Sequence, residues 1–114
     1  MKGLKKRLIQ KADELEWSVT IDGKEWEFEK YSPAGEDFLF SVSVEDVMDL
    51  WVKVWSYACD FDTEEHIKMW VEAKNSGTSG VPSIRTLVED ADAIEDMLEE
   101  LADALREVTE EDAK

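Results

Sequence analysis

Oxygen-bearing side chains alternate along residues 60–64, just ahead of His66, the single histidine of the chain. Alternating oxygen ligands are typical of the start of a calcium-binding loop. Such a loop also needs glycine at its sixth position and a bidentate glutamate at its twelfth, where this chain has Glu65 and Val71. We therefore interpret the run as a helix cap, and we predict no calcium site.

Two further groups of residues could carry catalysis, and neither is complete. Cys59 and His66 could act as nucleophile and base, but they are separated by a predicted helix break and lack a third group that orients the histidine. The run 77–80, with two glycines, lacks the lysine and the spacing of a phosphate-binding loop. We expect a buried Cys59, a helix-start His66 and a connecting loop at 77–80. The sequence predicts no enzyme activity, no catalytic residue, no metal and no cofactor.

Net charge is the strongest chemical signal in the chain. There are 29 acidic and 13 basic residues among 114, a formal net charge of −16, whereas a small domain commonly carries a magnitude of about 2 to 8. Residues 1–12 hold five bases and no acid, while residues 89–114 hold twelve acids and two bases. This balance argues against direct binding to nucleic acid or to an anionic membrane, since both repel carboxylates. It predicts a basic partner.

The carboxylates are concentrated on a predicted last helix, from about residue 83 to residue 108. Its apolar residues repeat at alternating spacings of three and four, and the acidic residues fall outside this seam. Like charges stand four residues apart at several places, and each such pair costs about 0.2–0.5 kcal/mol. We predict a partner-binding surface made of Glu89, Asp92, Glu95, Asp96, Glu99, Glu100 and Asp103. A strand row made of Glu25, Glu27 and Glu29 could extend it.

The sequence leaves open three alternative roles for the acidic helix. Its charges could simply be solvated, or they could pair with the basic residues of the first helix. The apolar seam could instead join a second copy of the chain as a coiled coil. That seam could equally cover the predicted sheet, which is the arrangement that we favour.

Changes in the period of the apolar residues predict the elements that position these side chains. A helix is expected over residues 2–16, strands over 17–22, 25–29 and 38–42, and helices beyond residue 43. Asp22-Gly23 is a typical two-residue hairpin turn, and residues 75–82 form a linker. We predict one α+β domain over residues 1–114, in which an N-terminal helix and a three-stranded antiparallel meander precede three helices packed on the sheet.

Residue types at the element ends refine this prediction. Ser43 with Asp46, and Asp62 with Glu65, resemble capping boxes that begin the second and third helices. The first five elements follow the order of double-stranded-RNA-binding domains. Those domains need basic residues over phosphate, so we do not expect RNA binding.

Apolar and sulfur-containing residues indicate compartment and interface. A lone cysteine fits a reducing compartment, and no apolar run reaches the roughly 20 residues that span a bilayer. We therefore predict a cytoplasmic protein. Most of the five tryptophans are expected in the core. Trp26 and Trp70 are the candidates for an exposed interface anchor.

Two stretches of the chain have a family resemblance. Residues 31–38 (YSPAGEDF), and the run from Glu65-His66 through Met69-Trp70 and Gly80-Val81-Pro82 into the acidic last helix, resemble small acidic proteins of bacterial phages and conjugative elements. These proteins are mostly uncharacterised, and the resemblance transfers no functional residue. It implies a genomic setting in which small acidic proteins inhibit restriction or CRISPR nucleases by imitating DNA.

The sequence therefore predicts a non-enzymatic acidic protein, monomeric or weakly dimeric, that binds a basic partner. A DNA mimic acting on a nuclease or a DNA-binding protein is its most concrete form. The alternative is a structural or assembly protein that self-associates through the seam of the last helix.

Overall fold

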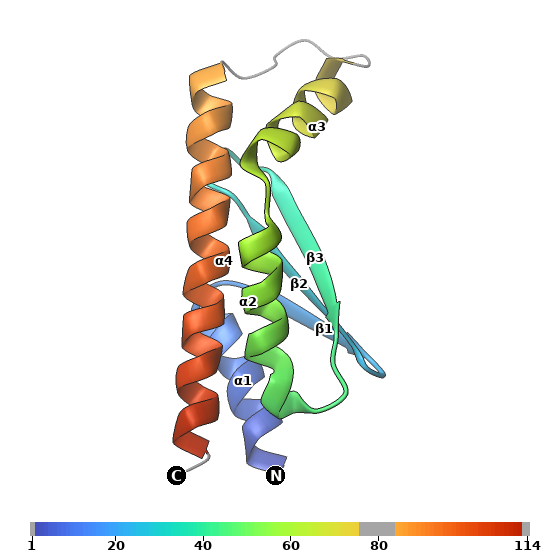
Figure 1. The fold of residues 1–114 in the computed structure, drawn as a ribbon, viewed down its shortest axis with the longest axis vertical. Coiled ribbons are helices and arrows are strands. Elements are labelled where there is room, and N and C mark those ends of the chain that lie inside the picture. Colours follow the sequence, from blue (N-terminus) through green and yellow to red (C-terminus); the bar gives the residue numbers. More distant parts are fainter. Residues whose placement is uncertain (1, 76–83, 113–114) are drawn as a thin grey trace.

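The computed structural model describes residues 2–75 and 84–112, and it confirms the predicted α+β order (Figure 1). The run 77–80 lies outside the described residues, as does the predicted linker beyond Asn75. The elements are α1 (Lys2–Glu14), β1 (Ser18–Asp22), β2 (Glu25–Tyr31), β3 (Asp37–Ser43), a 3-10 turn (Val47–Asp49), α2 (Leu50–Asp60), α3 (Thr63–Asn75) and α4 (Ile84–Asp112).

The three strands form an antiparallel meander in the order β1-β2-β3. Asp22 pairs with Glu25, so the two-residue turn is Gly23-Lys24, one residue later than predicted. Gly23 has φ +62°, and glycine at the first central position is typical of a type II′ turn, whose twist suits a hairpin. Trp26 and Phe28 are buried, whereas the glutamates that alternate with them on β2 face away from the core.

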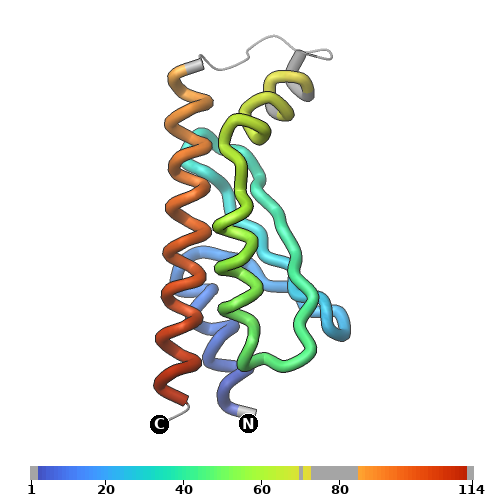
Figure 2. The backbone as a smooth tube through the Cα atoms, in the orientation of Figure 1, coloured from blue at the N-terminus to red at the C-terminus, as the bar shows by residue number. Residues whose placement is uncertain are grey.

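All the helices lie on one side of the sheet. α1 contacts β1, α2 contacts β3, and α4 packs along both α2 and α1 (Figures 1 and 2). At about 1.5 Å per residue, α4 runs along most of the 51 Å length of the molecule. Because α4 packs on α1 and α2, it lies farther from the sheet than those two helices do.

Trp17 is the centre of the aromatic core. It is 1% exposed, and its ring makes edge-on contacts with Phe28, Phe38 and Phe40 at centroid distances of 5.6–6.4 Å. The predicted seam of α4 is buried, and from Ile94 onward it belongs to the same core. Its members from the second turn onward are Leu87, Ala91, Ile94, Leu98, Leu101, Leu105 and Val108. These contacts join the sheet and the helices in one hydrophobic core.

The backbone at the end of α1 makes that helix two residues shorter than predicted. Glu16 has φ +71°, while Trp17 N donates to Ala12 O and Glu16 N donates to Asp13 O, both at 2.9 Å. This is the Schellman pattern that ends many helices, here with glutamate where glycine is usual. Lys30 Nζ donates to Leu15 O at 2.7 Å and so places a cation at the helix C-terminus, where it is favourable.

The predicted cap at Ser43 is wrong, whereas the cap at Asp62 is confirmed. Ser43 stays in the sheet, paired with Glu25, because the ladder continues to the end of β3. Asp46 instead caps the 3-10 turn by accepting from Met48 N at 3.0 Å. Asp62 accepts from Glu65 N at 3.2 Å and so begins α3. α4 continues past the predicted end at residue 108, as far as Asp112.

One acidic residue of α4 is structural. Asp90 is only 3% exposed, and its carboxylate accepts from Ser32 Oγ at 2.6 Å and from Ala34 N at 2.8 Å. Ser32 Oγ in turn accepts from Glu36 N at 3.0 Å. Asp90 therefore fastens α4 to the turn between β2 and β3, a role that its place in an acidic run conceals.

We expect Asp90→Ala to lower the free energy of unfolding by about 2–3 kcal/mol, because it leaves the Ser32 hydroxyl and the Ala34 amide without their acceptor. Urea unfolding measures this change. The matched control is Glu89→Ala, at the exposed neighbouring position, which should alter stability by less than about 0.5 kcal/mol. Equal effects of the two variants would contradict the fastening role.

Candidate acidic binding surface

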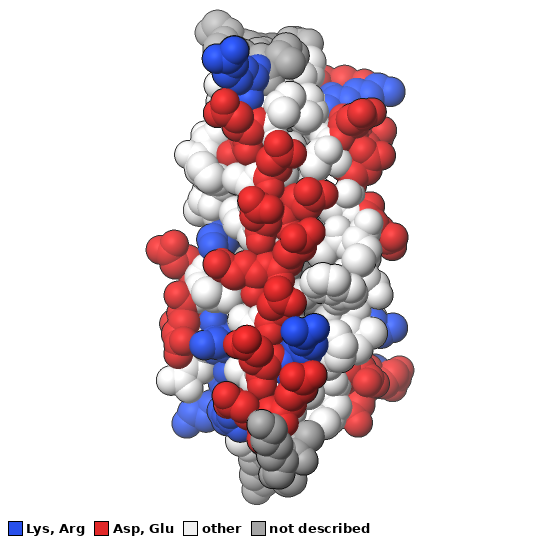
Figure 3. All heavy atoms as spheres, turned by 60° about the vertical axis from the view of Figure 1, so that its left-hand side comes forward, with Lys and Arg blue, Asp and Glu red and all other residues white. Residues whose placement is uncertain are grey.

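The burial of the apolar seam places the acidic residues of α4 on its outer face. Of the predicted binding residues on this helix, Glu95 is half-buried and the others are exposed. No basic residue interrupts positions 89–103. A stripe of carboxylates runs along the molecule in Figure 3. We call the residues Glu89, Asp92, Glu95, Asp96, Glu99, Glu100 and Asp103 the α4 stripe.

No carboxylate of the α4 stripe forms an ion pair or a hydrogen bond with another described residue. Arg7 of the basic helix α1 contacts the far end of α4, where it lies 3.0 Å from Glu111 and 3.3 Å from Asp112. Lys11 pairs with Glu14 of its own helix at 3.5 Å. Internal pairing with the first helix therefore does not account for the stripe.

The predicted strand row lies on a different face. Glu25, Glu27 and Glu29 alternate with the buried residues of β2 and so point away from the helices, on the open face of the sheet. α4 lies on the helical side, beyond α1 and α2 (Figure 1). The structure therefore separates the residues into two acidic surfaces, and the strand row does not continue the α4 stripe.

Repulsion within the sheet face shifts the titration of one member. A hydrogen bond with Asp37 and the negative charge of that residue raise the pKa of Glu29 above its usual value of 4.5, with a smaller contribution from Glu27. Asp37 lies at the start of β3, diagonal to Glu29 in the strand register. The hydrogen bond and the repulsion therefore both favour the protonated form of Glu29.

We expect Glu29→Gln to raise the melting temperature above pH 4.5, the usual pKa, and to leave it unchanged well below. A raised pKa means that the folded state holds more protons than the unfolded state, so stability falls as pH rises through the transition. Thermal melts across this range measure the difference. Asp37→Asn should give the same gain, and the double variant should add little to either single one. Additive gains would show that the two groups do not interact.

We expect the four substitutions Asp92→Asn, Asp96→Asn, Glu99→Gln and Asp103→Asn together to stabilise the fold. They relieve every like-charged pair four residues apart between Asp92 and Glu107, about 1–2.5 kcal/mol in total at low ionic strength. Urea unfolding at low and high salt measures this gain, which should shrink as salt screens the charges. A variant that is less stable than the parent at low salt would contradict the repulsion.

The exposed tryptophan is not one of those predicted. Trp26 is 3% exposed and belongs to the core, and the side chain of Trp70 lies outside what the structure describes. Trp55 is instead 40% exposed, because α2 buries the stripe Leu50, Val54 and Ala58 and leaves Trp55 at its margin. Most residues of α2 are apolar, so the sequence pattern does not show which of them faces water.

Cys59 and His66 lie in different surroundings. Cys59 is exposed, contrary to the prediction of a buried thiol, and it does not line the hollow of about 460 Å³ beside His66. His66 Nε2 lies 2.8 Å from Glu36 Oε2, and its ring contacts those of Phe38 and Phe61. The histidine therefore links α3 to the turn between β2 and β3. Sequence spacing could not indicate this contact, since thirty positions separate the two residues.

Residues 2–75 and 84–112 contain no group of three or more histidine, cysteine or acidic side chains placed to hold a metal ion. Within the same ranges, no helix combines the length and the apolar character that a membrane crossing requires.

Comparison of the chain with protein-family models, curated proteins and solved structures returned no match.

Proposed function

We propose that the protein is a non-enzymatic binding protein that presents the α4 stripe to a basic partner. The supporting observation is that the stripe is exposed and unpaired among the described residues, although basic residues were available on the neighbouring helix. A helix that carries repulsion of this size is easier to understand if a cationic partner relieves it. Association would be fast and sensitive to salt, as electrostatic steering requires.

The form of partner that we favour is a DNA-binding protein or nuclease whose groove the stripe occupies as a DNA mimic. Consecutive carboxylates of the seven-residue stripe are about 3.5 Å apart on average along the helix axis, because α-helices rise about 1.5 Å per residue. Phosphates of one DNA strand are about 3.4 Å apart. A groove built for phosphates would therefore meet charges at a similar density.

Self-association through the seam of α4 is the alternative function, and burial weighs against it. Ile94, Leu98 and Leu101 lie in the middle of the seam, and each is 0% exposed within the domain. A coiled coil between two copies would need the same side chains. The seam could join a second copy only if α4 left α1 and α2, which would open the core.

The experiment is affinity capture from bacterial lysate with three baits, read by mass spectrometry. The baits are the parent protein, the α4 variant with Asp92, Asp96, Glu99 and Asp103 neutralised, and a sheet variant with Asp22, Glu25, Glu27 and Glu29 neutralised. Both variants lose four negative charges, so they differ only in which face is changed. We expect one DNA-binding protein or nuclease to be retained by the parent and the sheet variant and lost by the α4 variant.

Salt and competing duplex DNA should release that protein, and the parent should inhibit its DNA binding in a gel-shift assay. Equal retention by the α4 variant, or capture of generic basic proteins alone, would contradict the proposal.

A further inference from the structure

We propose that a groove between α1 and β1 binds an extended segment of another protein, which adds a strand to the open edge of β1. The segment carries an aliphatic residue and an acidic residue on the same face. This site is distinct from the α4 stripe and does not depend on it.

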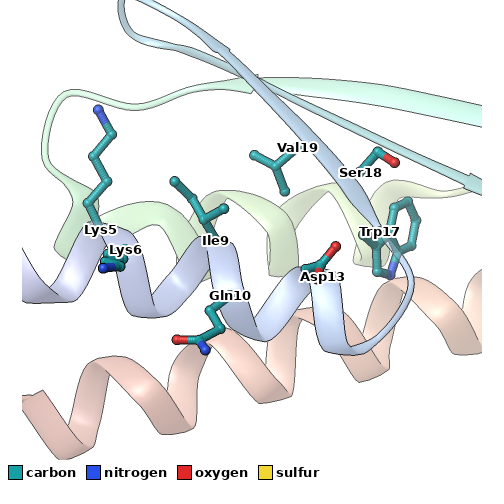
Figure 4. Close-up of a pocket in the computed structure, with 8 residues that line it drawn as sticks. All are labelled: Lys5, Lys6, Ile9, Gln10, Asp13, Trp17, Ser18 and Val19. Atoms are coloured by element: carbon teal, nitrogen blue, oxygen red, sulfur yellow. The ribbon is translucent and has the colours of Figure 1, made fainter.

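The groove is a hollow of about 680 Å³ that opens between the two elements (Figure 4). Ile9 of α1 and Val19 of β1 extend toward each other in its middle, Trp17 and Ser18 lie at one end, and Lys5 lies at the other. Ile9 and Val19 are both partly buried against the core. The groove therefore offers an apolar floor of a size that suits one or two aliphatic side chains.

The edge of β1 beside this groove has free hydrogen-bonding groups. β1 is an outer strand of the sheet, and among the described strands only β2 pairs with it. Asp22 and Glu25 flank a two-residue turn and so form a hydrogen-bonded pair, which directs the amides and carbonyls of Ser18, Thr20 and Asp22 to β2. The backbone groups of Val19 and Ile21 consequently point outward. Such an edge can accept a further strand.

The charges around the groove select the chemistry of the strand. Lys5 and Lys6 are exposed and make no ion pair with another described residue, although acidic residues outnumber basic ones 29 to 13 in the chain. Asp13 is the one acidic residue that lines the groove among the described residues. Charges farther than about 8 Å are largely screened at physiological salt. The two lysines therefore favour an acidic side chain at their end of the groove.

The pattern of the bound segment follows from the alternation of side chains along a strand. Positions that face the helices meet Ile9, Val19 and the two lysines, so they should be aliphatic and acidic. The intervening positions face the open side of the sheet, where Asp22 and Glu27 lie, and they should be neutral. A second copy of β1 fits poorly, because its inward positions Val19 and Ile21 supply no acid.

The test uses fluorescein-labelled peptides and fluorescence anisotropy. In the first probe threonine occupies every second position, and the positions between are valine, aspartate and aspartate in that order. The second probe has these three residues in the reverse order, because the bound segment could run parallel or antiparallel to β1. One control peptide has asparagine in place of aspartate, and another moves the aspartates by one position, onto the opposite face. We expect one probe to bind, and both controls to bind at least about tenfold more weakly.

Variants locate the binding. Lys5→Gln with Lys6→Gln should weaken binding of the probe about tenfold, whereas the matched pair Lys53→Gln with Lys68→Gln, at exposed lysines elsewhere, should leave it unchanged. Bound probe should also slow hydrogen exchange at the Val19 and Ile21 amides of the parent protein, a measurement that needs no variant. Failure of both probes to bind, equal binding by the Lys5/Lys6 variant, or unchanged exchange would overturn the proposal. The proposal would also be overturned if the parent protein formed dimers that the Lys5/Lys6 variant disrupted, since the groove would then hold a second copy of the chain.

Discussion

The burial of one face of α4 is the constraint on which the rest of the molecule depends. From Ile94 onward its seam residues pack against α1 and α2 and share one core with Trp17 and the phenylalanines of the sheet. A helix that buries one stripe must expose the opposite one. Because the exposed positions from Glu89 to Asp103 are all acidic, folding itself assembles a row of carboxylates along the outer face of the helix.

The polar contacts of the fold keep this support in place and leave the row free. Asp90 is used to hold the turn between β2 and β3, and Glu111 and Asp112 are used to hold Arg7 of α1. The acidic residues of α4 thus divide into a few structural anchors and a larger unpaired set. Unpaired like charges lower stability. Natural proteins often keep such destabilising residues where function requires them. The division is the physical basis for our proposal that the α4 stripe binds a partner.

The basic residues of α1 likewise divide into paired and unpaired ones. Arg7 and Lys11 are engaged in ion pairs, whereas Lys5 and Lys6 remain unpaired among the described residues beside an apolar groove and an open strand edge. The molecule therefore carries two surfaces of opposite local charge, one on α4 and one in the groove between α1 and β1. A protein with this arrangement could hold a basic partner on α4 while a different chain occupies β1.

The sequence by itself determined the order of the elements and the composition of the α4 stripe. Periodicity sets which residues of a helix or strand share a face, and the spacing of the seam from Leu87 to Val108 is regular enough to be read directly. Only the tertiary structure decided which faces adjoin. It separated Glu29 from the stripe, buried Asp90, exposed Trp55 and Cys59, and brought His66 to Glu36. These outcomes depend on contacts between residues distant in the chain, and local periodicity carries no information about them.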